Sequence, residues 1–178
     1  VVYGNRAYEN ALLELKDILK EHGCRIVAGA AYIGEHSFSS SGTPVAEFRP
    51  DLEDLTHAEL FGRNIKEKLQ MVSSVDQIPD LDVPGSYPYG GVTELWSVDF
   101  IAVGIECKQC GICARGCPTG AIDSENAYII DKVKCITCCA CIKNCPQKAR
   151  TMKAGPVADA AARLNKFYSE RKMPQSFV

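Results

Sequence analysis

Residues 107–118 read CKQCGICARGCP, and residues 135–146 read CITCCACIKNCP. Both stretches follow one spacing, C-x2-C-x2-C-x3-C-P, and together they hold eight of the ten cysteines. The offset from Cys107 to Cys135 is the same as that from Cys117 to Cys145, which indicates an internal duplication. Thiolates at this spacing are typical ligands of cubane iron–sulfur clusters. The duplicated pattern therefore predicts two 4Fe–4S clusters in the second half of the chain.

The ligands of the two clusters are expected to cross between the copies. In this arrangement the first three cysteines of a run hold one cluster, and the fourth reaches to the other. The proline after each fourth cysteine, Pro118 or Pro146, has a fixed φ and no N–H, so we expect it to open a short helical turn. The expected ligands are Cys107, Cys110, Cys113 and Cys145 for the first cluster, and Cys117, Cys135, Cys138 and Cys141 for the second.

Two other uses of the cysteines fit the spacing less well. A disulfide framework is typical of small secreted chains in oxidising compartments. Structural zinc favours two CxxC pairs separated by a long spacer, whereas here a third cysteine follows after two residues. The two remaining cysteines are expected to be small packing residues, Cys139 beside the second cluster and Cys24 at a helix end.

The residues between and around the two runs are expected to shield the clusters. Residues 121–123 and 127–131 alternate weakly about a turn at 124–126, which predicts a β-hairpin. An apolar coat that excludes water tunes the cluster potential. The expected coat is Ile105, Ile112, Ile122, Ile130, Ile136 and Ile142.

Charge is distributed unevenly along the chain. Residues 105–178 hold 12 Lys and Arg against 6 Asp and Glu, while residues 1–104 hold 8 against 16. A basic surface could steer an acidic redox partner protein; its candidates are Lys108, Arg115, Lys143, Lys148 and Arg150. No aromatic stacking platform accompanies these cations, so nucleic-acid binding is not expected. No apolar stretch is long enough for a membrane span and no leader is recognisable, so we expect no membrane association and a cytoplasmic location.

The segment 1–72 predicts a parallel α/β arrangement. Val1-Val2 resembles the end of a buried strand, a helix follows up to Gly23, and RIVAGAAYI (25–33) reads as a second strand. A second helix is expected with a capping box at Thr56 and Glu59. Two strands alone make no stable sheet, so this region reads as the back half of a doubly wound domain whose front half is absent.

The remaining segments complete an α+β chain with four predicted regions. Pro, Gly, Asp and Tyr without periodicity predict an ordered linker, and the last segment predicts a helix over 158–172 that Pro174 ends. The predicted regions are 1–72 for the α/β part, 73–98 for the linker, 99–152 for the two-cluster domain and 153–178 for a helical tail.

Over nearly its whole length the chain resembles the flavodoxin–ferredoxin fusion proteins, in which an FMN-binding flavodoxin-like domain precedes a two-cluster ferredoxin. The resemblance rests on VVYGNRAYENALLELKDILKEHG (1–23), AAYIGEHSF (30–38), VPGSYPY (83–89), KMPQSF (172–177) and both cysteine runs. It implies a bacterial two-cluster ferredoxin fold after the back half of a flavodoxin-like domain. It also implies that Tyr3, Gly4 and Asn5 lie near the isoalloxazine of an FMN bound by the complete domain.

These expectations define an electron-transfer protein that passes single electrons through two clusters, to or from FMN. Two alternatives remain open at this stage, an electron-transfer subunit of a larger oxidoreductase complex and a redox or oxygen sensor. A homodimer is one further option. No catalytic residue is predicted, because His22, His36 and His57 are scattered and no nucleotide or hydrolase motif is recognisable.

Overall fold

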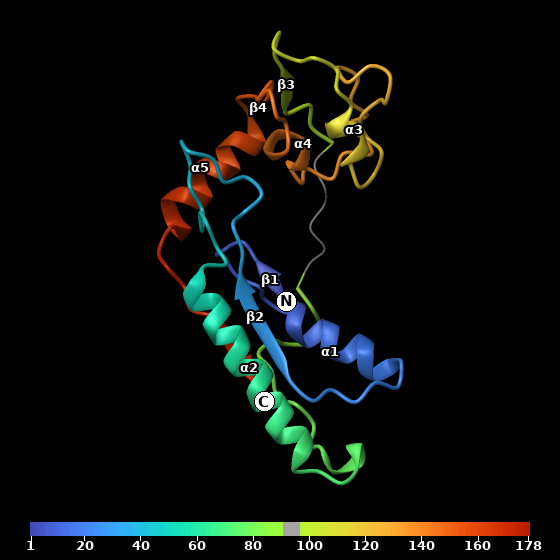
Figure 1. The fold of residues 1–178 in the computed structure, drawn as a ribbon, viewed down its shortest axis with the longest axis vertical. Coiled ribbons are helices and arrows are strands. Elements are labelled where there is room, and N and C mark those ends of the chain that lie inside the picture. Colours follow the sequence, from blue (N-terminus) through green and yellow to red (C-terminus); the bar gives the residue numbers. More distant parts are fainter. Residues whose placement is uncertain (91–96) are drawn as a thin grey trace. The chain divides into compact units, whose positions relative to one another are not determined.

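The computed structural model describes residues 1–90 and 97–178 (Figure 1). The chain divides into two compact units, and each unit is made of segments that are not contiguous in the sequence. The first unit comprises Val1–His36, Pro44–Gly91 and Phe167–Val178, and the cysteine unit comprises Ser37–Thr43 and Val92–Lys166. Helices and strands occur in both units, so the chain is of the α+β class.

The first unit contains a three-stranded sheet with the order β1-β2-β5. Strand β1 (Val2–Tyr3) runs parallel to β2 (Gly29–Ile33), and helix α1 (Ala11–Glu21) connects them, as the sequence predicted. The predicted second strand is shorter than expected, because residues 25–28 lie outside β2. Residue Gly23 follows the helix with a φ of 80°, a conformation that favours glycine at a helix end.

The third strand of this sheet comes from the C-terminus. Strand β5 (Gln175–Phe177) pairs antiparallel with β2 in the register Ala30↔Ser176. The prediction of a helical tail over 153–178 is therefore wrong for its last residues. Helix α5 (Pro156–Tyr168) also ends before the expected residue 172, and Pro174 instead precedes the strand.

Helix α2 (Leu52–Gln70) begins one turn before the predicted capping box. Its N-cap is Asp51, whose side chain accepts from the N–H groups of Glu53 and Asp54, while the Asp54 side chain accepts from the Asp51 N–H. Residue Thr56 lies inside the helix, and its hydroxyl donates to the Leu52 carbonyl at 2.8 Å. The predicted box at Thr56 and Glu59 is wrong because Asp51 and Asp54 fulfil both capping roles earlier in the chain.

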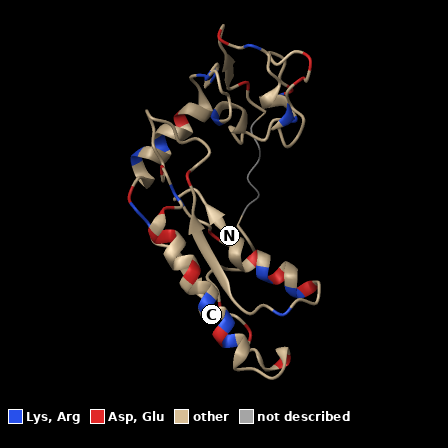
Figure 2. Cartoon of the chain, in the orientation of Figure 1, with Lys and Arg blue, Asp and Glu red and all other residues tan. Residues whose placement is uncertain are grey.

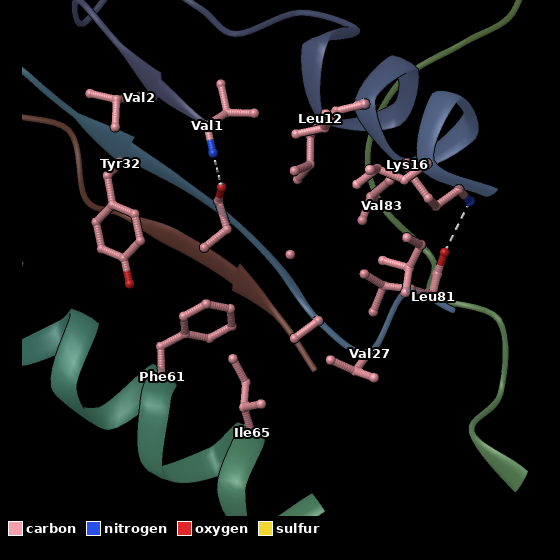
Figure 3. Close-up of a pocket in the computed structure, with 16 residues that line it drawn as sticks. Val1, Val2, Leu12, Lys16, Val27, Tyr32, Phe61, Ile65, Leu81 and Val83 are labelled. Atoms are coloured by element: carbon pink, nitrogen blue, oxygen red, sulfur yellow. Dashed lines mark hydrogen bonds between the residues drawn. The ribbon is translucent and has the colours of Figure 1, made fainter. Parts of the chain in front are cut away.

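Much of the predicted linker is packed into the first unit. A 3-10 turn at Val75–Gln77 leads to Ile78, which is fully buried, and Leu81 and Val83 pack with Leu12 of α1. Leu12, Leu81 and Val83 line an apolar cavity of about 350 Å³ together with Phe61 and Ile65 of α2. Figure 3 shows these five side chains. Residues 91–96 of the predicted linker lie outside the described residues.

Apart from helix α5, most of which belongs to it, the cysteine unit has only very short elements among its described residues. Strands β3 (Ile101–Val103) and β4 (Arg150–Met152) form an antiparallel pair, and helices α3 (Ile112–Arg115) and α4 (Ala140–Lys143) have four residues each. The hairpin predicted between the cysteine runs is reduced to one antiparallel bridge, Ile122↔Ile130. In the described part of the chain, no helix is long and apolar enough to cross a membrane.

Candidate metal centre

The internal duplication is visible in the backbone of the two cysteine runs. Three pairs of equivalent positions share the left-handed conformation, with φ values of 49° and 54°, 72° and 58°, and 61° and 48°. The residues in these pairs are Gln109 and Thr137, Gly111 and Cys139, and Gly120 and Lys148. Left-handed φ is uncommon outside glycine, so its recurrence at matched positions indicates that both runs wrap their contents in the same way.

The hydrogen bonds of the two runs match as well. The short helices begin with Arg115 N donating to Gly111 O and Lys143 N to Cys139 O, both at 3.0 Å. Each helix contains the third cysteine of its run and ends before the fourth, whereas the sequence analysis placed the helical turn after the fourth. After the fourth cysteine a turn follows instead, in which Gly120 N donates to Cys117 O at 3.2 Å. Proline at the second position of such a turn fits its fixed φ.

The cysteines line two separate cavities in the cysteine unit. One cavity is lined by four cysteines, together with Lys108, Gln109, Ile112, Ala127, Pro146, Gln147 and Arg150. These cysteines are Cys107, Cys110, Cys113 and Cys145, the set that the spacing assigns to the first cluster. We call this space the first cavity. The fourth cysteine, Cys145, comes from the other run and directly follows the C-cap residue of α4.

The second cavity is lined by Cys117, Cys135, Cys138 and Cys141, the set assigned to the second cluster, and by Cys139. Its other lining is mainly apolar and includes Phe100, Ile101, Ile122, Ile130 and Ile136. Residue Cys139 is 3% exposed and belongs to a buried group with Phe100, Ile101 and Val157. The prediction that Cys139 is a small buried residue is confirmed, and its burial raises the pKa of its thiol to about 12.

Hydrogen-bond donors are directed at the sulfur of Cys117. The Ala121 N–H donates to Cys117 Sγ at 3.3 Å, and the Thr119 hydroxyl lies 3.7 Å from the same sulfur. Burial alone would raise the pKa of this thiol, but the hydrogen bonds from Thr119, Ala121 and Ile122 outweigh it and lower the pKa. Donors that stabilise a thiolate prepare a cysteine for metal ligation. Sequence reasoning missed Thr119, whose place one residue after Cys-Pro was its only signal.

Arg150 occupies a position that the sequence analysis misjudged. It was counted among the surface cations that could steer a partner, but it is 2% exposed. Its Nη2 donates to the carbonyl of Ala127, while its Nη1 is buried and has no hydrogen-bond partner among the described residues. The same side chain lines the first cavity. An unpaired buried guanidinium N–H fits a cavity whose contents carry negative charge, as a thiolate-ligated cluster does.

Two other packing predictions are corrected by the structure. Ile105 is 94% exposed and takes no part in an apolar coat. Cys24 is exposed rather than packed. The other predicted coat residues line the two cavities or pack against the groups of buried apolar side chains beside them. They are Ile112, Ile122, Ile130, Ile136 and Ile142.

A single metal ion and a cubane make different demands on these cysteines. Among the described residues, no group of three or more His, Cys, Asp or Glu is placed to hold a metal ion. A mononuclear site needs its ligands to converge within about 2.3 Å of one point. In a cubane each thiolate binds a different iron at its own corner. Four cysteines that line one cavity are compatible with the second demand.

The three residues expected near a flavin have different surroundings. Tyr3 lines an open cavity with Arg6, Tyr8 and Lys172. At Gly4 an added Cβ would lie 2.3 Å from Cδ2 of His36, so the imidazole ring occupies the space that the missing side chain leaves. Asn5 is 1% exposed, and its Nδ2 donates to the carbonyls of Tyr168 and Glu170 at 2.6 and 2.8 Å. Only Tyr3 of the three is thus placed to meet a ligand in that cavity.

The charge of the two units differs in sign (Figure 2). The cysteine unit carries 10 Lys and Arg against 7 Asp and Glu, and the first unit carries 10 against 15. Of the five cations proposed to steer a partner, Lys108, Arg115, Lys143 and Lys148 are exposed. A comparison of the chain with protein families, with curated proteins and with solved structures finds no match.

Proposed function

We propose that this chain is an iron–sulfur electron-transfer protein that passes single electrons through two 4Fe–4S clusters. The proposal takes the cysteine unit as a bacterial two-cluster ferredoxin fold and the first unit as the back half of a flavodoxin-like domain. The observation that carries it is the division of eight cysteines into two sets of four. Each set lines its own cavity, and each draws three members from one run and one from the other.

The residues around the cavities have defined roles in this proposal. Cysteine thiolates would ligate the irons, with Cys107, Cys110, Cys113 and Cys145 at one cluster and Cys117, Cys135, Cys138 and Cys141 at the other. Bound clusters supply one-electron chemistry at potentials of about −700 to +450 mV. The Ala121 N–H and the Thr119 hydroxyl stabilise negative charge on Cys117 Sγ. Buried Phe100 and Ile101 keep water from the second cavity.

The flavin part of the proposal rests on Tyr3 and the cavity that it lines. Tyr3 lines an open cavity with two cations, Arg6 and Lys172, and an aromatic ring can stack on isoalloxazine. Gly4 and Asn5 are engaged by His36 and by the C-terminal segment. We therefore retain FMN as a partner cofactor of a complete flavodoxin-like domain, with Tyr3 as the contact residue. A redox partner protein would meet the exposed Lys and Arg of the cysteine unit.

Crossed ligation tests the proposed function directly. In anaerobically prepared Cys117→Ser, we expect the second cluster to be lost or altered and the first to be retained, because Cys117 lines only the second cavity with Cys135, Cys138 and Cys141. Cys145→Ser should give the reverse. The measurement is iron per chain together with Mössbauer and EPR spectra of each variant.

A matched control is Cys24→Ser, which removes an exposed thiol outside both cavities. It should keep about eight irons per chain, four for each cubane. Equal loss of both clusters in Cys117→Ser and Cys145→Ser, or loss of the first cluster alone in Cys117→Ser, would contradict the crossed arrangement. An unaltered iron content in both variants would contradict cluster ligation itself.

A further inference from the structure

The two cavities have the same backbone but differently charged walls. When the two runs are aligned on their cysteines, Arg150 at the first cavity corresponds to Ile122 at the second, and Lys108 corresponds to Ile136. The sulfur ligands and the turns are repeated, whereas these two positions are not. The duplication is therefore broken at the residues that would set the electrostatic environment of each cluster.

We infer that Arg150, assisted by Lys108, gives the cluster of the first cavity a higher reduction potential than the cluster of the second. The inference rests on the proposed function, because it needs both clusters to be present. Reduction adds one electron and one negative charge to a cluster, with no bond formed or broken. A nearby fixed cation stabilises that added charge, so it raises the potential.

The burial of Arg150 makes its charge effective. The side chain is 2% exposed, and opposite charges attract more strongly in a poorly polarisable interior than in water. Its Nη1 has no hydrogen-bond partner among the described residues, which leaves a donor for the contents of the cavity. Cys110, another residue of this cavity, is exposed, and access of water also favours the more negative state.

The second cavity has the opposite character. Its lining includes Phe100, Ile101, Ile122, Ile130 and Ile136, and a low-dielectric wall disfavours added negative charge. Arg150 lines the first cavity and not the second, so its charge should raise the potential of the first cluster more than that of the second.

The consequence is a direction for the electron within the cysteine unit. An electron that enters at the second cluster passes to the first, because the first has the higher potential. The protein that has taken up one electron holds it at the cluster of Cys107, Cys110, Cys113 and Cys145. The second cluster would then be the strongly reducing one.

The test is a redox titration of the intact chain with both clusters bound, followed by EPR. The wild type should show two separate one-electron steps, and the step of higher potential should be the one altered in Cys145→Ser. Arg150→Gln keeps a donor for the Ala127 carbonyl but removes the charge. It should shift the higher step to more negative potential, and by more than the lower step. Arg150→Lys should restore most of the difference.

Lys148→Gln is the control, since it removes one exposed cation close to Arg150 in the sequence and should shift neither step appreciably. If Arg150→Gln does not bind two clusters, the inference is tested with Lys108→Gln instead. This variant should shift the higher step to more negative potential, by less than the shift expected for Arg150→Gln. Two equal potentials in the wild type, or a larger shift of the lower step, would overturn the inference. A wild type without two clusters would instead overturn the proposed function.

Discussion

The first unit combines two long helices, α1 and α2, with a three-stranded sheet, whereas the cysteine unit holds its cysteines with the single-turn helices α3 and α4 and the short strand pair β3 and β4. The two units also differ in the size of their buried side chains. Large aliphatic side chains such as Ile33, Ile78 and Leu81 are buried in the first unit, while the cysteine unit buries mainly alanine and cysteine beside Phe100, Ile101, Ile122 and Val157.

A small domain with little apolar core commonly needs a metal or cross-links for stability. The comparison indicates that the first unit is stabilised by its own packing and ion pairs. The cysteine unit is expected to depend on what its thiolates bind, because ligand binding then becomes part of the folding free energy.

Removal of the metal should produce the largest difference in stability between the two units. When iron is chelated under reducing conditions, we expect hydrogen exchange to accelerate throughout residues 99–152 while α1 and β2 keep their protection. The reason is that metal binding supplies folding free energy only where the ligands lie. Segment-resolved hydrogen exchange with mass spectrometry measures this. Unchanged protection of α3 and α4 in the iron-free protein would contradict a metal-dependent fold.

A substitution in the first unit should destabilise that unit without changing the metal content of the protein. Arg49 and Asp54 form a buried ion pair, with Asp54 1% exposed and Arg49 8% exposed. Asp54→Asn leaves the guanidinium without its main counter-charge, so we expect a loss of about 3–5 kcal/mol in unfolding free energy of this unit. Urea unfolding followed by hydrogen exchange of α2 and β2 would measure the loss.

The matched control is Glu53→Gln. Its carboxylate pairs with Arg171 at 2.6 Å but is well exposed, so the expected cost is below about 1 kcal/mol. Both variants should keep the iron content of the wild type. An equal loss of unfolding free energy in the two variants would contradict the prediction that the buried ion pair stabilises the first unit more than the exposed one.

A smaller effect is expected from pH, because protonation removes the charge of Asp54 but leaves its side chain in place. The hydrogen bond with Arg49 lowers the pKa of Asp54, against the effect of burial. The carboxylate therefore contributes its full stabilisation above its unfolded pKa, about 3.9, and loses it as the pH falls towards the lowered folded value. Hydrogen exchange of α2 as a function of pH should show this acid loss in the wild type, and a weaker one in Asp54→Asn.

The sequence predicted the parts of the fold that local patterns specify. The parallel pair of β1 and β2 around α1 is confirmed, since it follows from apolar periodicity and a glycine stop. Strand β5 was missed because Gln175–Phe177 has no alternation of its own and depends on pairing with β2. The burial of Ile78, Leu81 and Val83 was missed because a Pro- and Gly-rich composition does not reveal which side chains a distant helix covers.

The candidate site shows the same limit. Cysteine spacing separated eight residues into two sets, and the same sets line two cavities. The burial of Arg150 was not predicted, because its Nη2 acceptor is the carbonyl of Ala127, which lies between the two cysteine runs. An alignment of the two copies offered one signal, an arginine opposite Ile122. Spacing specifies the ligands, whereas the charges around them depend on tertiary packing.

The most direct test of the central claim is the amount of iron and acid-labile sulfide per chain in protein assembled anaerobically. Two cubane clusters on these eight cysteines predict about eight irons and about eight sulfides per chain, with the broad visible absorption of thiolate-bound clusters. Zinc at one or two equivalents without sulfide, or disulfide bonds among the eight cysteines under the same conditions, would contradict the account.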